Sequence, residues 1–130
     1  MKCLSLLLLF FATNLFGQYQ AKVDSTLNHY FKVTELELGK IKIDTLDNYK
    51  FYYSEIILDD GQKVYVNKYV GDAINFFEDI SGIKSPRIHR AQVMCPKLDE
   101  KTLELWKNWI GLNREKISWC LEKNKPCTKN

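Results

Sequence analysis

Recognisable catalytic motifs are missing from this 130-residue sequence. It has no Gly-x-Ser-x-Gly nucleophile motif, no His-Glu-x-x-His zinc motif, no phosphate-binding glycine loop and no calcium-binding loop. Histidine is scarce, since His29 and His89 are the only two, and the cysteines do not form the close pairs that zinc sites favour. We therefore expect no metal and no cofactor, and we favour a protein that is not an enzyme.

An excess of charge of one sign is also absent. The sequence has 19 Lys and Arg against 16 Asp and Glu, a net charge of +3. This balance is too mild to predict a nucleic-acid partner. The one long apolar run, residues 4–16, is shorter than the roughly 20 residues that a membrane-spanning helix needs.

The apolar run has the character of a secretory signal. Lys2 precedes it, and Gly17 offers a small residue for cleavage before Gln18. We interpret residues 1–17 as a signal peptide and residues 18–130 as one small domain, exported to the periplasm or the medium, with no stable membrane insertion after cleavage. The alternative is a retained N-terminal membrane anchor.

The predicted compartment also determines how the cysteines are interpreted. Cys3 would leave with the signal, so Cys95, Cys120 and Cys127 remain. An oxidising compartment favours a structural disulfide over metal binding, and a third thiol is left over. The predicted elements favour Cys95 as one partner, without deciding between Cys120 and Cys127. Three free thiols are the alternative.

The predicted fold class is α+β. We expect an antiparallel β-meander of about four or five strands, packed against a long amphipathic C-terminal helix, with a short N-terminal helix. In residues 19–31, four apolar side chains recur at helical spacing and leave His29 on the solvent side: Tyr19, Val23, Leu27 and Tyr30. Strands are predicted from alternating patterns over residues 34–38, 40–44, 49–58 and 62–70, with turns at 39–40, 47–48 and 59–61.

Two further helices are expected. Asp72 is a good N-cap and Gly82 a good stop for a helix over residues 72–81, whose apolar side would contain Ala73, Phe76, Phe77 and Ile80. An extended segment follows Pro86. Asp99 can cap a helix that runs to Lys123, because the apolar phase continues past Gly111. We favour this single helix of about 24 residues over two helices broken at residues 111–113.

The candidate binding surface lies on the last predicted hairpin. If Leu58 pairs with Gln62, the aliphatic side chains of Ile56, Leu58, Val64 and Val66 share one face, which we expect to be core. The other face mixes aromatic and polar groups, and its candidate binding residues are Phe51, Tyr53, Tyr65 and Tyr69. Tyrosine offers a large contact area at low entropic cost. The alternative is a half-solvated or helix-covered sheet face.

A basic cluster supplies two more candidates, Arg87 and His89, next to Lys84 and Arg90. It could bind a carboxylate or phosphate group, or it could be a solvated basic edge. Our first hypothesis is an exported binding protein, such as an inhibitor, an immunity-type protein or an accessory protein, with a protein or small ligand as partner. The alternative is a small hydrolase or ligand-binding enzyme with His89 as general base, which requires a concave site and a nearby carboxylate.

Overall fold

The computed structural model describes residues 2–90 and 92–129, and the side chains of Leu9, 11–90 and 92–129. Its contacts divide the chain into two compact units. The first unit is Met1–Asn28 with Asn113–Asn130, and the second is His29–Leu112. The side chain of Cys3 lies outside the described residues.

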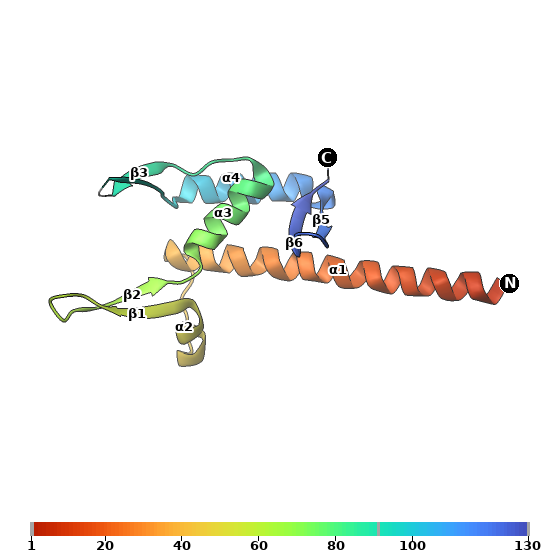
Figure 1. Cartoon of the computed structure of the whole chain (residues 1–130), viewed down its shortest axis with the longest axis horizontal. Coiled ribbons are helices and arrows are strands. Elements are labelled where there is room, and N and C mark those ends of the chain that lie inside the picture. The colour runs from red at the N-terminus through yellow and green to blue at the C-terminus, as the bar shows by residue number, and fades with distance from the viewer. Residues whose placement is uncertain (1, 91, 130) are drawn as a thin grey trace. The chain divides into compact units, whose positions relative to one another are not determined.

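The longest helix is at the N-terminal end of the chain, so the predicted short N-terminal helix is wrong. Helix α1 (Lys2–Glu37) is the long helix that begins at the N-terminus in Figure 1. It has 36 residues and contributes to both units. The predicted helical stripe is confirmed, because Val23 and Leu27 are buried while Tyr19 and Tyr30 are half-buried. Among the described residues, no helix has the length and apolar character needed to cross a membrane.

The strands predicted over residues 34–38 and 40–44 are wrong. Residues 34–37 are the last turn of α1, and residues 42–44 have no regular structure. Leu36 is buried with Val33 at helical spacing, in a cluster that includes Tyr52 and Ala73. Gly39 has a φ of 68° and donates its N–H to the Leu36 carbonyl at 3.1 Å, so it ends a helix and does not turn a hairpin.

The first unit joins α1 to a C-terminal hairpin. A short 3-10 helix, η1 (Arg114–Lys116), leads into β5 (Ile117–Cys120), which pairs antiparallel with β6 (Lys125–Thr128). Ile117 is 2% exposed, and Arg114 bonds to Asp24 of α1. The turn uses Asn124, whose φ is +49°.

The predicted long C-terminal helix is therefore wrong. Helix α4 (Glu100–Asn113) stops after 14 residues, near the alternative break point, and a hairpin follows in place of a second helix. Asp99 is confirmed as its cap, since its Oδ1 accepts the Thr102 N–H at 2.7 Å. The segment from Ile117 to Cys120 satisfies a strand pattern as well as a helical one, and its pairing with β6 decides between them.

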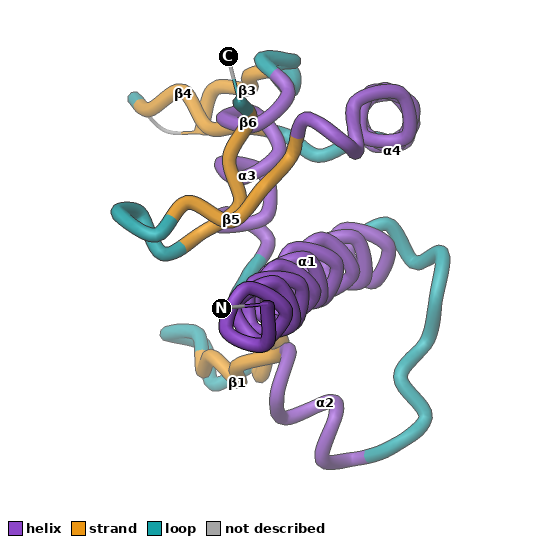
Figure 2. Tube along the Cα trace, turned by 90° about the vertical axis from the view of Figure 1, so that its right-hand side faces the viewer, coloured by secondary structure: helices purple, strands orange, loops and turns teal. Residues whose placement is uncertain are grey.

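Three two-stranded sheets replace the predicted meander. In the second unit, α2 (Leu46–Tyr52) leads directly into β1 (Tyr53–Ile57), as Figure 2 shows, and β1 pairs antiparallel with β2 (Lys63–Asn67). Helix α3 (Val70–Ser81) comes next, followed by the antiparallel pair β3 (Arg87–Arg90) and β4 (Val93–Pro96). The fold class is still α+β, but its strands form separate hairpins.

The core of the second unit is helical. The four apolar residues predicted for α3 are buried, and Gly82 ends the helix in the left-handed conformation, as expected. Asp72 lies in the first turn, while Tyr69 occupies the N-cap position. Phe77 stacks on Trp106 of α4 with ring centroids 5.1 Å apart, and Lys107 of α4 donates to Glu35 of α1 at 2.9 Å.

The disulfide joins Cys120 and Cys127 across the β5–β6 hairpin, with 5.9 Å between their Cα atoms. Cys95, on β4, is a free, half-buried thiol, so the expected pairing through Cys95 is wrong. Both bonded residues lie on one face of the same hairpin, because Cys120 is opposite Lys125 and Cys127 is opposite Ser118. The disulfide therefore closes a local hairpin.

Removing this disulfide should lower the stability of the first unit. We expect the Cys120→Ser/Cys127→Ser double variant to lose about 2–3 kcal/mol of unfolding free energy, because the closed loop is short. The measurement is urea denaturation beside Cys95→Ser, for which we expect a change below about 1 kcal/mol. Thiol alkylation before reduction should label Cys95 and spare the other two, and a protected Cys95 would contradict the pairing.

Candidate functional site

One concave candidate site combines α2 with the β1–β2 hairpin. A hollow of about 290 Å³ lies there. We call it the tyrosine hollow, and its lining residues are Leu46, Tyr49, Lys50, Tyr53, Glu55 and Tyr65. Tyr53 and Tyr65 were predicted binding residues, so the structure brings two of the six candidates together here.

Local chemistry positions the first wall of the hollow. Thr45 caps α2, since its Oγ1 accepts the Asn48 N–H at 3.4 Å. The helix ends where the Tyr53 N–H bonds to the Tyr49 carbonyl and the chain enters β1. This junction stacks the rings of Tyr49 and Tyr53, with centroids 4.8 Å apart and planes 17° apart.

The second wall comes from the hairpin register. The predicted register is confirmed, because Leu58 donates to the Gln62 carbonyl at 2.8 Å and Glu55 is opposite Tyr65. Tyr65 meets Tyr49 edge-on, with centroids 5.4 Å apart. Its hydroxyl donates to Glu55 at 3.1 Å, and the ammonium of Lys63 lies 3.1 Å from the other carboxylate oxygen.

These polar contacts define the charges at the hollow. The Lys63 ammonium, followed by the Tyr65 hydroxyl, holds the pKa of Glu55 below its ordinary value. The bond to Glu55 raises the pKa of Tyr65, and burial raises that of Tyr53. Both phenols are therefore neutral hydrogen-bonding groups near pH 7, beside a compensated carboxylate. The site offers contact area and hydrogen bonds more than charge.

A second hollow, of about 310 Å³, shares the stacked pair as a wall. Its other lining residues are Leu36, Ile41, Lys42 and Ile43. The aromatic pair thus separates two adjoining depressions. Each depression also has one lysine in its lining, Lys50 in the first and Lys42 in the second.

Phe51 and Tyr69, two further predicted binding residues, lie in a different aromatic cluster. His29 contacts both of them and also Tyr52, at ring-centroid distances of 5.3–6.2 Å. His29 is half-buried there, so its predicted position on the solvent side is wrong. Burial, aided by Lys32, lowers the pKa of His29, which therefore carries no charge at neutral pH. The predicted tyrosine face is divided between two clusters.

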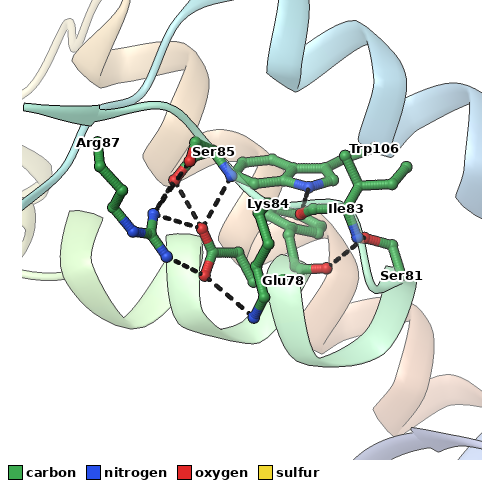
Figure 3. Close-up of polar contacts among 8 residues, drawn as sticks. Glu78, Ser81, Ile83, Lys84, Ser85, Arg87 and Trp106 are labelled. Atoms are coloured by element: carbon green, nitrogen blue, oxygen red, sulfur yellow. Dashed lines mark hydrogen bonds and ion pairs between the residues drawn. The ribbon is translucent and has the colours of Figure 1, made fainter.

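Arg87 is engaged within the protein. Its guanidinium donates to both carboxylate oxygens of Glu78, at 2.7 and 2.8 Å (Figure 3). Ser85 donates its N–H and its hydroxyl to the same carboxylate, at 2.9 and 2.7 Å. The Arg87 bonds, more than those of Ser85, lower the pKa of Glu78 to about 2. This arrangement fastens the chain before β3 to α3 and leaves Arg87 poorly placed for a ligand.

His89 is exposed on β3, opposite Met94. Its imidazole makes no hydrogen bond or ion pair with the residues that the structure describes. This position does not supply the carboxylate partner that the hydrolase hypothesis requires. In the described part of the chain, no group of three or more His, Cys, Asp or Glu side chains could hold a metal ion.

Comparison with known proteins adds no family. No protein-family model matches the chain, and no curated protein or solved structure is significantly similar to it.

Sequence reasoning missed four residues of the hollow, Leu46, Tyr49, Lys50 and Glu55. The predicted strand over residues 49–58 includes residues 49–52, which are helical in the structure. Tyr49 was therefore not expected beside Tyr53. Two signals could have revealed it: Thr45 followed by Asp47 is typical of a helix start, and the two tyrosines have i,i+4 spacing.

Proposed function

We propose that this chain is an exported binding protein whose tyrosine hollow holds a segment of another protein. The observation that carries the proposal is the concave, tyrosine-walled site between α2 and β1–β2. Tyrosine rings supply contact area and hydroxyls with little loss of side-chain freedom, as at many protein interfaces.

The two adjoining hollows suit neighbouring side chains of a protein segment. Pockets for drug-sized ligands have volumes of about 300–1,000 Å³ and enclose most of the ligand. At about 290 Å³, the tyrosine hollow suits one or two side chains, and the adjoining hollow of about 310 Å³ could receive the next. A peptide that crosses the stacked pair would occupy both depressions.

Export is supported by the sequence and by the cysteines. The apolar run at residues 4–16 is typical of a signal peptide. A disulfide between Cys120 and Cys127 is compatible with an oxidising compartment, in which such bonds persist. Both features favour the periplasm or the medium as the place of action.

The test uses a displayed library of random peptides. Peptides selected on the wild-type chain should bind the Tyr65→Ala and Tyr49→Ala variants at least 10-fold more weakly, because central aromatic residues contribute most to such interfaces. Affinities are measured by titration with the synthesised peptides. Phe51→Ala is the matched control, because Phe51 and Tyr65 are both 51% exposed and Phe51 lies in the other aromatic cluster.

Two results would contradict the proposal. One is a library that yields no peptide above background. The other is a set of selected peptides that bind Tyr65→Ala as tightly as the wild type. Circular dichroism of each variant should match the wild type, so that lost binding is not lost folding.

A further inference from the structure

The second face of the β1–β2 hairpin is mostly apolar and largely exposed. We call its apolar part the aliphatic face, and it consists of Ile56, Leu58, Val64 and Val66. Ser54, opposite Val66, and Gln62, opposite Leu58, lie on the same side, and Val64 is half-buried. Ile56 is 45% exposed, and Leu58 and Val66 are each 43% exposed, so the prediction that this face is core is wrong. A two-stranded hairpin is only marginally stable in water unless something covers its apolar face. We therefore expect another surface to cover the aliphatic face.

Opposite charges mark the two ends of this face. The ladder continues to a bond of 2.8 Å from the Lys68 N–H to the Tyr52 carbonyl, so Lys68 follows Val64 and Val66 on the same face. The loop at the other end carries Asp59 and Asp60, both exposed. Within the described residues, none of these three charged groups belongs to an ion pair. The Lys68 ammonium does donate to the Lys50 carbonyl at 2.9 Å and lies 5.9 Å from the centroid of the Tyr69 ring. Asp60 accepts the Gln62 N–H at 2.9 Å, and all three charged residues remain exposed.

The spacing of the charges matches the length of the aliphatic face. From residue 62 to residue 68 an antiparallel strand rises about 20 Å. A basic end, an apolar middle and an acidic end therefore follow one another along one surface. Such a surface is complementary to itself when a second copy is turned by 180°.

We propose that a second copy of this chain covers the aliphatic face. Two hairpins pack face to face and antiparallel about a two-fold axis, the arrangement that an isologous interface requires. The aliphatic side chains of the two copies then meet, as in the packing of two β-sheets about 10 Å apart. Lys68 of each copy lies near Asp59 and Asp60 of the other.

The dimer should be weak and reversible, because two five-residue strands offer much less than the roughly 800 Å² per partner of a standard interface. The tyrosine hollow belongs to the opposite face of the hairpin, as Glu55 and Tyr65 do. It stays open in the dimer, so a dimer would present two hollows. The inference does not depend on what those hollows bind.

The test is sedimentation velocity of the exported chain over a dilution series from about 1 to 300 μM. We expect a monomer–dimer equilibrium with a micromolar dissociation constant. Val66→Lys should raise that constant by roughly 100-fold, because it places two uncompensated charges in the interface. Val93→Lys is the matched control, since Val93 is 61% exposed on the other hairpin of the same unit, and it should leave the constant within about 2-fold.

Charge reversal tests the orientation of the two copies. Lys68→Asp alone, or Asp59→Lys with Asp60→Lys, should weaken the dimer about 10-fold, whereas the three changes combined should restore it, because the pairs reform with reversed sign. A chain that is monomeric at 300 μM would overturn the proposal, as would a dimer that Val66→Lys leaves intact. Failure of the triple variant to recover, with wild-type circular dichroism, would exclude the antiparallel pairing.

Discussion

Replacing Trp106 by alanine is expected to lower the unfolding free energy of the second unit by about 3–5 kcal/mol. Trp106 is fully buried, and its ring stacks on Phe77. Its indole N–H also donates to the Ile83 carbonyl at 3.0 Å, a bond that is drawn in Figure 3. The substitution leaves a large cavity and an unpaired carbonyl, two costs that add.

The measurement is urea denaturation followed by far-ultraviolet circular dichroism, which does not depend on tryptophan emission. Leu105→Ala is the control on the same helix, and because Leu105 is 44% exposed we expect a loss below about 1 kcal/mol. Trp106→Phe keeps an aromatic ring but removes the donor, so its effect should fall between the two. Equal effects of Trp106→Ala and Leu105→Ala would contradict the assigned core.

Predictions from local chemistry agree best with the structure. Helix α3 was expected from its apolar spacing and from Gly82, which adopts the left-handed conformation at the helix end. The register of β1–β2 was expected from the loop at residues 59–61, and Asp99 from the capping preference. Each signal lies within about four residues of the feature that it determines, so no distant contact is needed to interpret it.

Predictions that depend on distant contacts were wrong. Residues 34–38 alternate like a strand, yet Val33 and Leu36 also have helical spacing, and burial with Tyr52 and Ala73 favours the helix. The segment after Asn113 shows the opposite error, because it was predicted as a helix and forms a strand. There a helical phase is present in the sequence, but pairing with β6 gives a strand. Periodicity over so few residues fits both structures.

The candidate site could be predicted only in part for the same reason. Tyr53 and Tyr65 follow from the hairpin register, whereas Tyr49 depends on a helix that the alternating pattern concealed. Arg87 looked available because its partner Glu78 is nine residues away, on a different element. Only the packing of residues 82–86 against α3 brings the two charges together.

The carboxylate of Glu78 should make the second unit sensitive to acid. Glu78 is 5% exposed, and its pKa of about 2 in the folded chain lies below the ordinary value of 4.5. Between these two values the unfolded chain binds more protons than the folded one. The carboxylate therefore contributes its full stabilisation, about 3 kcal/mol, above pH 4.5, and loses it as the pH falls toward 2.

Glu78→Gln should remove both the stabilisation and its pH dependence. Gln keeps an oxygen for the N–H of Ser85, but it leaves the Arg87 guanidinium without its bidentate partner. We expect a loss of about 2–4 kcal/mol at pH 7, measured by urea denaturation at pH values from 2.5 to 7. At pH 2.5, the difference in unfolding free energy between variant and wild type should be less than half of its value at pH 7.

Two further variants distinguish the contribution of the Glu78–Arg87 contact to stability from a general effect of removing a charge. Glu122→Gln removes an exposed acid of the first unit and should change the unfolding free energy by less than about 0.5 kcal/mol. Arg87→Gln leaves Glu78 buried without its strongest donor, so its effect and that of Glu78→Gln should not add in the double variant. Additive effects, or a Glu78→Gln loss that is the same at pH 2.5 and pH 7, would show that the guanidinium–carboxylate contact contributes little to stability.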